Sequence, residues 1–152
     1  MLRYAMTFTH ARVPYQLLIL TASLDRVDIL KLTLPAGRPN ALTQQRMCGL
    51  TAKHNGVKCL SYLRENGYAW DTSTAVGAAR FGSHECLDYA LTHGCPRDEE
   101  AITRTATQAE HLDCLKCALK HGCQLSEQIR EQLRMFQVDE DNPCDVYLRT
   151  LF

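Results

Sequence analysis

The sequence has no long apolar run and no excess of either charge. Its longest compact hydrophobic stretch, Leu17–Leu20, is far shorter than the roughly 20 residues that a membrane-spanning helix needs. Lys and Arg together number 17, as do Asp and Glu, so no overall field attracts a nucleic-acid backbone or an anionic membrane. We therefore expect neither membrane insertion nor nucleic-acid binding.

The short motifs of common enzyme classes are also missing. The sequence contains no P-loop, G-x-G-x-x-G, G-x-S-x-G or H-E-x-x-H pattern. His84 beside Glu85 and His111 near Asp113 come closest to acid–base pairs, but both pairs stand at the starts of predicted helices. We expect no enzymatic activity and no cofactor.

Cysteine, in contrast, is frequent. Eight cysteines among 152 residues fall just below the density of a secreted disulfide scaffold, and no secretory signal is recognisable. We expect reduced thiols and a cytoplasmic protein. The alternative is an organelle such as the mitochondrion, because the first 24 residues contain Arg3 and Arg12 and no acid precedes Asp25.

The cysteines belong to an internal repeat. The segments CLSYLRENGYAWD (Cys59–Asp71), CLDYALTHGCPRD (Cys86–Asp98) and CLKCALKHGCQLS (Cys114–Ser126) start 27 and 28 residues apart. A fainter copy, ILKLTLPAG (Ile29–Gly37), carries isoleucine at the first cysteine position. Isoleucine cannot bind a metal but fits a buried apolar position, so this column of cysteines is predicted to pack in the core.

Each copy is predicted to be a pair of antiparallel helices. Small residues precede the cysteine column by seven and eight positions, and apolar residues follow at helical spacings of three and four. The turn between the two segments is short, as in Asn55-Gly56. Thr72 or Ser73, Asp98 and Ser126 stand where a helix N-cap is expected. The second helix of each copy should end at a glycine of positive φ, and these are Gly37, Gly67, Gly94 and Gly122.

The copy STAVGAARFGSHECLDYALTHG (Ser73–Gly94) resembles the ankyrin repeat. Four such units, 16–37, 46–67, 73–94 and 101–122, each run 21 positions from start to closing glycine. The unit is five or six residues shorter than the usual length of about 33, and the shortening falls in the connector. None of the four starts reads TPLH, and the pattern is closest to short, Cys-rich ankyrin-like repeats of protist and giant-virus proteins. The resemblance implies one all-α domain, 1–152, built as a solenoid of about four repeats.

The two ends are predicted to cap this stack. Residues 1–15 should shield the first repeat, and residues 126–152 should form a helical cap. In the latter, Ser126–Phe136 is amphipathic and Asn142-Pro143 is a favourable helix start. We expect the apolar residues of the terminal helix to pack on the fourth repeat or on a partner, and these are Val146, Leu148, Leu151 and Phe152.

In the fourth repeat, the cysteines could instead form a metal site. Cys114, Cys117, His121 and Cys123 form a C-x2-C-x3-H-x-C pattern, and the first three share one helix face. Three of the four positions recur in other copies, so only Cys117 is peculiar to this one. We expect no bound metal, and a zinc-binding or redox module using the cysteines is the alternative function.

The resemblance implies function through the surface. Ankyrin-like repeats hold other proteins, so we expect a non-catalytic interaction module or scaffold, including an accessory subunit of a larger assembly. The family's contact positions fall at the end of the first helix and in the connector. Trp, Phe and Arg dominate interface energies, although for the two aromatic residues the alternative is a packing role. The predicted partner-binding residues are Lys53, Trp70, Arg80, Phe81, Arg97 and Gln108.

Overall fold

The computed structural model describes residues 15–34, 39–135 and 139–151. Within these residues the chain forms ten helices and no strand, which confirms the predicted all-α class. The helices are α1 (Tyr15–Ser23), α2 (Val27–Thr33), α3 (Ala41–Lys53), α4 (Val57–Glu65), α5 (Thr72–Arg80), α6 (His84–Thr92), α7 (Glu99–Gln108), α8 (Leu112–Lys120), α9 (Glu127–Arg134) and α10 (Pro143–Arg149). The predicted N-terminal cap, apart from Tyr15, and Gly37 lie outside the described residues.

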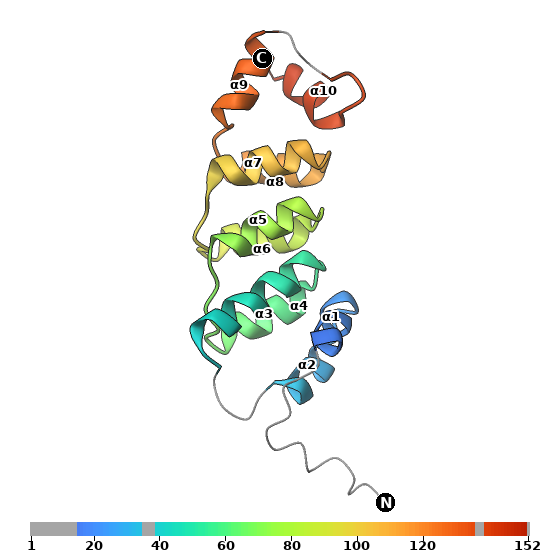
Figure 1. The fold of residues 1–152 in the computed structure, drawn as a ribbon, viewed down its shortest axis with the longest axis vertical. Coiled ribbons are helices and arrows are strands. Elements are labelled where there is room, and N and C mark those ends of the chain that lie inside the picture. Colours follow the sequence, from blue (N-terminus) through green and yellow to red (C-terminus); the bar gives the residue numbers. More distant parts are fainter. Residues whose placement is uncertain (1–14, 35–38, 136–138, 152) are drawn as a thin grey trace, which may run out of the picture.

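Successive helix pairs stack along the long axis of the molecule (Figure 1). The first helices pack on one another in the order α1, α3, α5 and α7, and the second helices in the order α2, α4, α6 and α8. The predicted small residues lie between the first helices, where they let the backbones approach closely. All eight are buried, and they are Thr21, Ala22, Thr51, Ala52, Ala78, Ala79, Ala106 and Thr107.

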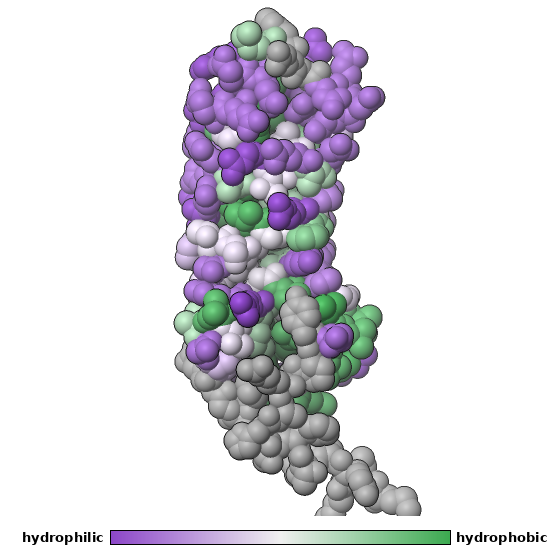
Figure 2. All heavy atoms as spheres, in the orientation of Figure 1, coloured by the Kyte–Doolittle hydropathy of each residue, from purple (hydrophilic) through white to green (hydrophobic). Residues whose placement is uncertain are grey.

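The described helices are short compared with the thickness of a bilayer. The longest, α3, has 13 residues. Among the helices that the structure describes, none is long and apolar enough to span a bilayer. Figure 2 shows that hydrophilic residues dominate the C-terminal end of the visible face and that hydrophobic residues gather at the opposite end, over α1.

The turn inside each of the first four pairs has the same backbone form. One residue of each turn adopts a positive φ, and these residues are Asp25 (48°), Asn55 (57°), Gly82 (73°) and Glu110 (59°). The second helices close in the same way, since Gly67, Gly94 and Gly122 have φ values of 75°, 75° and 77°. Glycine tolerates this conformation best, which confirms the predicted helix ends at these three positions.

The N-caps confirm most of the predicted helix starts and correct two of them. Asp98 and Ser126 cap α7 and α9 with their side chains, as predicted. The cap of α5 is Asp71 rather than Thr72 or Ser73, because the Asp71 carboxylate accepts a hydrogen bond from the Ser73 amide at 3.0 Å. Helix α3 begins at Ala41, before the predicted start at Arg46, since Asn40 caps it.

The cysteine column lies in the core and contacts the neighbouring helix pair. The thiol of Cys59 donates to the Thr21 carbonyl (3.6 Å), and the thiol of Cys86 donates to the Thr51 carbonyl (3.9 Å). Cys114 makes the equivalent contact with Ala78 O at 3.9 Å. Each thiol therefore fills a small space against the first helix of the preceding pair and satisfies its weak donor there.

Helix α10 continues this column. The Cys144 thiol lies 3.7 Å from Ala106 O, and the Asn142 side chain donates to Thr107 O at 3.0 Å. The C-terminal segment thus supplies a further second helix, which packs on α7 and α8. Of the apolar residues expected to pack on the fourth repeat or on a partner, Leu148 is fully buried, whereas Val146 and Leu151 are about half-exposed. Phe152 lies outside the described residues.

The burial of each leucine in the stacked core predicts how much it contributes to the free energy of unfolding. Leu87 of α6 is fully buried, whereas the side chain of Leu32 on α2 is 86% exposed. We expect Leu87→Ala to lower the free energy of unfolding by about 2–5 kcal/mol, because it leaves a cavity between helix pairs. The matched control Leu32→Ala should change it by less than about 0.5 kcal/mol. Urea unfolding followed by circular dichroism measures both, and equal losses would contradict this core.

Candidate functional site

Three predicted contact residues occupy the same place in successive helix pairs. Lys53, Arg80 and Gln108 are the last residues of α3, α5 and α7. Arg80 and Gln108 are exposed and Lys53 is half-buried. Phe81 follows directly as the C-cap of α5. We call Lys53, Arg80, Phe81 and Gln108 the turn row, since they lie where the first helices end beside their turns (Figure 1).

Two members of the turn row touch across the gap between pairs. The Lys53 Nζ atom lies 4.2 Å from the centroid of the Phe81 ring, within the range of a cation–π contact. The Phe81 side chain is nevertheless 48% exposed. The contact holds the ring in place at the surface and leaves one part of it open to a partner.

Trp70 lies in the core. Its side chain is 8% exposed, the Arg64 guanidinium carbon is 4.1 Å from its ring centroid, and Tyr89 meets it edge-on at 6.3 Å. This burial favours the packing role that the sequence left as an alternative. Little of the ring remains for a partner to contact.

Arg97 is exposed but belongs to another part of the surface. It pairs with Glu99 at 3.3 Å and donates to the His121 carbonyl at 3.2 Å. This places Arg97 in the connector that leads into α7, whereas the turn row lies at the opposite ends of the first helices. The six predicted residues therefore do not form one site.

A second group of functional side chains lies on the second helices. His121 Nε2 is 2.8 Å from Asp88 Oδ1, and Cys117 Sγ is 3.8 Å from the same oxygen. The nitrogen, oxygen and sulfur atoms all lie within 4.8 Å of one another, as a metal-binding group requires. Asp88 comes from α6, Cys117 from α8, and His121 is the C-cap of α8.

This group differs from the cluster that the sequence singled out. Cys117 and His121 belong to both, but Cys114 lies in the core against Ala78 O and Cys123 is also buried. Sequence reasoning missed Asp88. Its carboxylate stands one repeat earlier, and only the packing of α6 on α8 brings it to the other two.

The charges of this group follow from its contacts. The hydrogen bond with His121 holds the pKa of Asp88 below its ordinary value, and the nearby Lys120 adds to the effect. Burial, helped by the negative charge of Asp88, raises the pKa of Cys117 to about 12. At neutral pH the carboxylate is therefore ionised and the free thiol is protonated.

The group opens into a cavity of about 750 Å³. Residues of α4, α6 and α8 line this cavity, among them His84, His93, Lys120, Asp88 and Cys117. His93 is held by a 2.8 Å contact between its Nδ1 and the Tyr89 carbonyl. A small solute can thus reach the Asp88–Cys117 edge from solvent.

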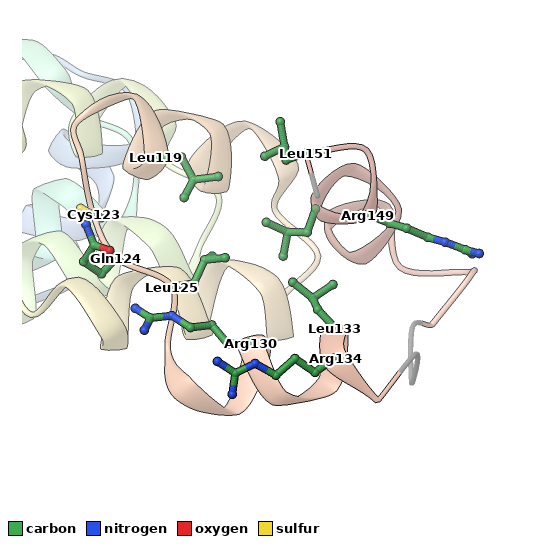
Figure 3. A pocket seen from close by; sticks show the side chains of 10 residues that line it. Leu119, Cys123, Gln124, Leu125, Arg130, Leu133, Arg134, Arg149 and Leu151 are labelled. Atoms are coloured by element: carbon green, nitrogen blue, oxygen red, sulfur yellow. The ribbon is translucent and has the colours of Figure 1, made fainter.

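An apolar cavity of about 710 Å³ lies near the C-terminal end, between α8, α9 and α10. Figure 3 shows Leu119, Leu125, Leu133 and Leu151 directed toward one another around it. Arg134 lies beside this cavity and pairs with Glu127 and Glu131 of its own helix. Leucines dominate the lining of this cavity, which also includes the buried Cys123 and the side chain of Arg130.

Comparison of the sequence with protein-family models and with curated proteins finds no match. A function for this chain is therefore inferred from the contacts, exposure and charges of its own residues.

The Asp88–His121 contact predicts a pH-dependent contribution to stability. A carboxylate whose pKa is lowered by folding stabilises the protein above its unfolded pKa of about 3.9, and this contribution is lost as the pH falls through the folded pKa. Because the Asp88 side chain is half-exposed, we expect Asp88→Asn to cost less than about 1 kcal/mol at pH 6. Urea midpoints of the wild-type protein and of Asp88→Asn should differ at pH 6 and converge at pH 3, and a difference that stays constant would contradict this role of the Asp88–His121 hydrogen bond.

The eight cysteines, all within the described residues, should differ in reactivity. Seven are buried, and Cys117 alone is partly exposed. Burial raises the pKa of Cys59, Cys86 and Cys114 to about 12, so little thiolate is present near pH 8. We expect iodoacetamide to modify Cys117 first and slowly, and the others only after unfolding. Peptide mass spectrometry identifies the modified residue, and early labelling of Cys86 would contradict this order.

Proposed function

We propose that the chain is a non-catalytic protein-interaction module built from ankyrin-like repeats. Support comes from features that recur from pair to pair: the small residues between first helices, the positive-φ turn residue, and the thiol contact with the preceding pair. The same contact at Cys144 extends the series to α10. Such a stack forms a solenoid, in which each repeat mainly contacts its neighbours and the sides remain available for binding.

The turn row carries this proposal. Its residues come from three consecutive helix pairs. They therefore extend along one side of the stack across several repeats, as the binding surface of a solenoid does. An exposed aromatic ring is the kind of group that dominates interface energies, and the Lys53 ammonium over the Phe81 ring favours one orientation of that ring. Less conformational entropy is then lost when a partner binds.

The chemistry of the turn row indicates the chemistry of its partner. Both charged members, Lys53 and Arg80, are cations, and each ends a helix where a positive charge also complements the helix dipole. The partner that fits is a protein surface with an apolar residue to cover Phe81 and carboxylates to meet the two cations. A multi-subunit assembly offers such a surface permanently.

A reducing compartment suits this module. All eight cysteines are free, and seven are buried where oxidation would disturb the packing between pairs. We propose a cytoplasmic location, with a reducing organelle such as the mitochondrion as the alternative.

Charge reversal in the turn row tests the proposal. We expect a variant with Arg80→Glu and Phe81→Ala to lose capture of its partner by at least about tenfold, because it removes an exposed ring and repels carboxylates. Crosslinking of the tagged full chain in cells, followed by quantitative mass spectrometry, measures the loss for each captured protein. The matched control combines Lys58→Glu with Leu32→Ala, both exposed residues of second helices.

The outcome separates binding from folding. Thermal unfolding should show the turn-row variant melting within a few degrees of the wild-type protein, since both altered residues are exposed. Trp70→Ala should behave in the opposite way, with a lower Tm and capture retained, because its ring is buried. If the control variant loses the same proteins as the turn-row variant, the binding surface lies elsewhere.

A further inference from the structure

We propose that Asp88, Cys117 and His121 form a zinc-binding site with three protein ligands and one open position. The site is independent of the turn row, because it lies on α6 and α8 and uses none of the turn-row residues. It also differs in composition from the cysteine-rich cluster of the fourth repeat, since it takes one ligand from the preceding repeat.

The distances between the ligand atoms fit a tetrahedral ion. For zinc bonds of about 2.0–2.1 Å to nitrogen or oxygen and about 2.3 Å to sulfur, tetrahedral ligands lie roughly 3.3–3.6 Å apart. His121 Nε2 and Asp88 Oδ1 are 2.8 Å apart, and Cys117 Sγ and Asp88 Oδ1 are 3.8 Å apart. The third separation, between His121 Nε2 and Cys117 Sγ, is within 4.8 Å. Side-chain movements on the order of 1 Å would therefore bring the three ligand atoms to tetrahedral separations.

The set of ligand atoms selects the class of metal. One thiolate, one imidazole and one carboxylate suit zinc, whereas magnesium and calcium prefer oxygen ligands alone. Asp88 brings a negative charge, and zinc would take the place of the hydrogen bond between Asp88 and His121. The Cys117 thiol loses its proton when the metal binds.

The backbone holds the ligands on packed helices. Cys117 lies in α8 and His121, four residues later, is the C-cap of this helix, so the two residues lie on the same side of its C-terminal end. That side meets α6 at Asp88, and α6 packs on α8 along the stack. Rigid supports of this kind reduce the cost of arranging the ligands around an ion.

The surroundings leave the fourth position open. Asp88 and Cys117 line the cavity of about 750 Å³, so an ion can enter and keep a water or a partner's ligand in this position. Lys120 Nζ lies 3.9 Å from Asp88 Oδ1 and opposes a cation there, but its side chain is 76% exposed and is free to turn into solvent. Its removal should strengthen binding.

Cobalt provides a spectroscopic test in the full chain, purified without a histidine tag. We expect one equivalent of Co²⁺ to bind with a thiolate-to-metal charge-transfer band, and Zn²⁺ to displace it and to protect Cys117 from iodoacetamide. Cys117→Ser should abolish the band. Asp88→Asn and His121→Gln should each weaken zinc binding by at least about 100-fold, measured in competition with a chelating dye. A loss of this size exceeds the roughly 10- to 100-fold loss of affinity that follows when a residue only hydrogen-bonded to a metal ligand is changed.

His93→Gln is the matched control, because His93 lines the same cavity but is held by Tyr89. It should leave the band and the zinc affinity unchanged, and Lys120→Ala should raise the affinity. Circular dichroism must show every variant folded. The proposal is overturned if the wild-type chain binds no zinc, if the band survives in Cys117→Ser, or if His93→Gln weakens binding as much as His121→Gln.

Discussion

The interface between successive helix pairs is the constraint on which the rest of the structure depends. A single pair of short helices cannot bury its apolar face, so each pair is stable only against its neighbours. Small residues such as Ala78 and Ala79 let the first helices approach, and the thiols of Cys86 and Cys114 reach the carbonyls of the pair before. Larger residues at these positions would force the pairs apart.

Two groups of side chains in this stack differ in chemical character. The turn row lies at the ends of first helices, where Arg80 and about half of the Phe81 side chain are exposed and Lys53 is half-buried. The Asp88–Cys117–His121 group lies on second helices, in a cavity with other polar side chains. The two groups share no residue.

The cysteines illustrate how position in the stack decides their role. Seven are buried and act as small apolar groups, with raised pKa values in the core. Cys117 occupies a column held by tyrosine in other pairs, at the edge of the cavity, beside a carboxylate and an imidazole. The same residue type is thus a packing group in one column and a candidate ligand in another.

Local patterns in the sequence determined the helices, their pairing and most of their ends. These features depend on interactions between residues close together in the chain, so a linear pattern reveals them. They are the helical spacing of apolar residues, the glycines at positive φ, and the N-caps Asp98 and Ser126. The column of Cys59, Cys86 and Cys114 was also visible, because repetition shows a shared environment. The longer spacing to Cys144 hid the last member of that column.

Only the tertiary structure decided which side chains meet. The register between α6 and α8 brings Asp88 to His121, and the register between α3 and α5 places Lys53 on Phe81. Packing also buried Trp70 between Arg64 and Tyr89. The Asp88–His121 and Lys53–Phe81 contacts join residues of adjacent helix pairs. Their geometry depends on the distance and the angle between one pair and the next, which no local pattern of residue types specifies.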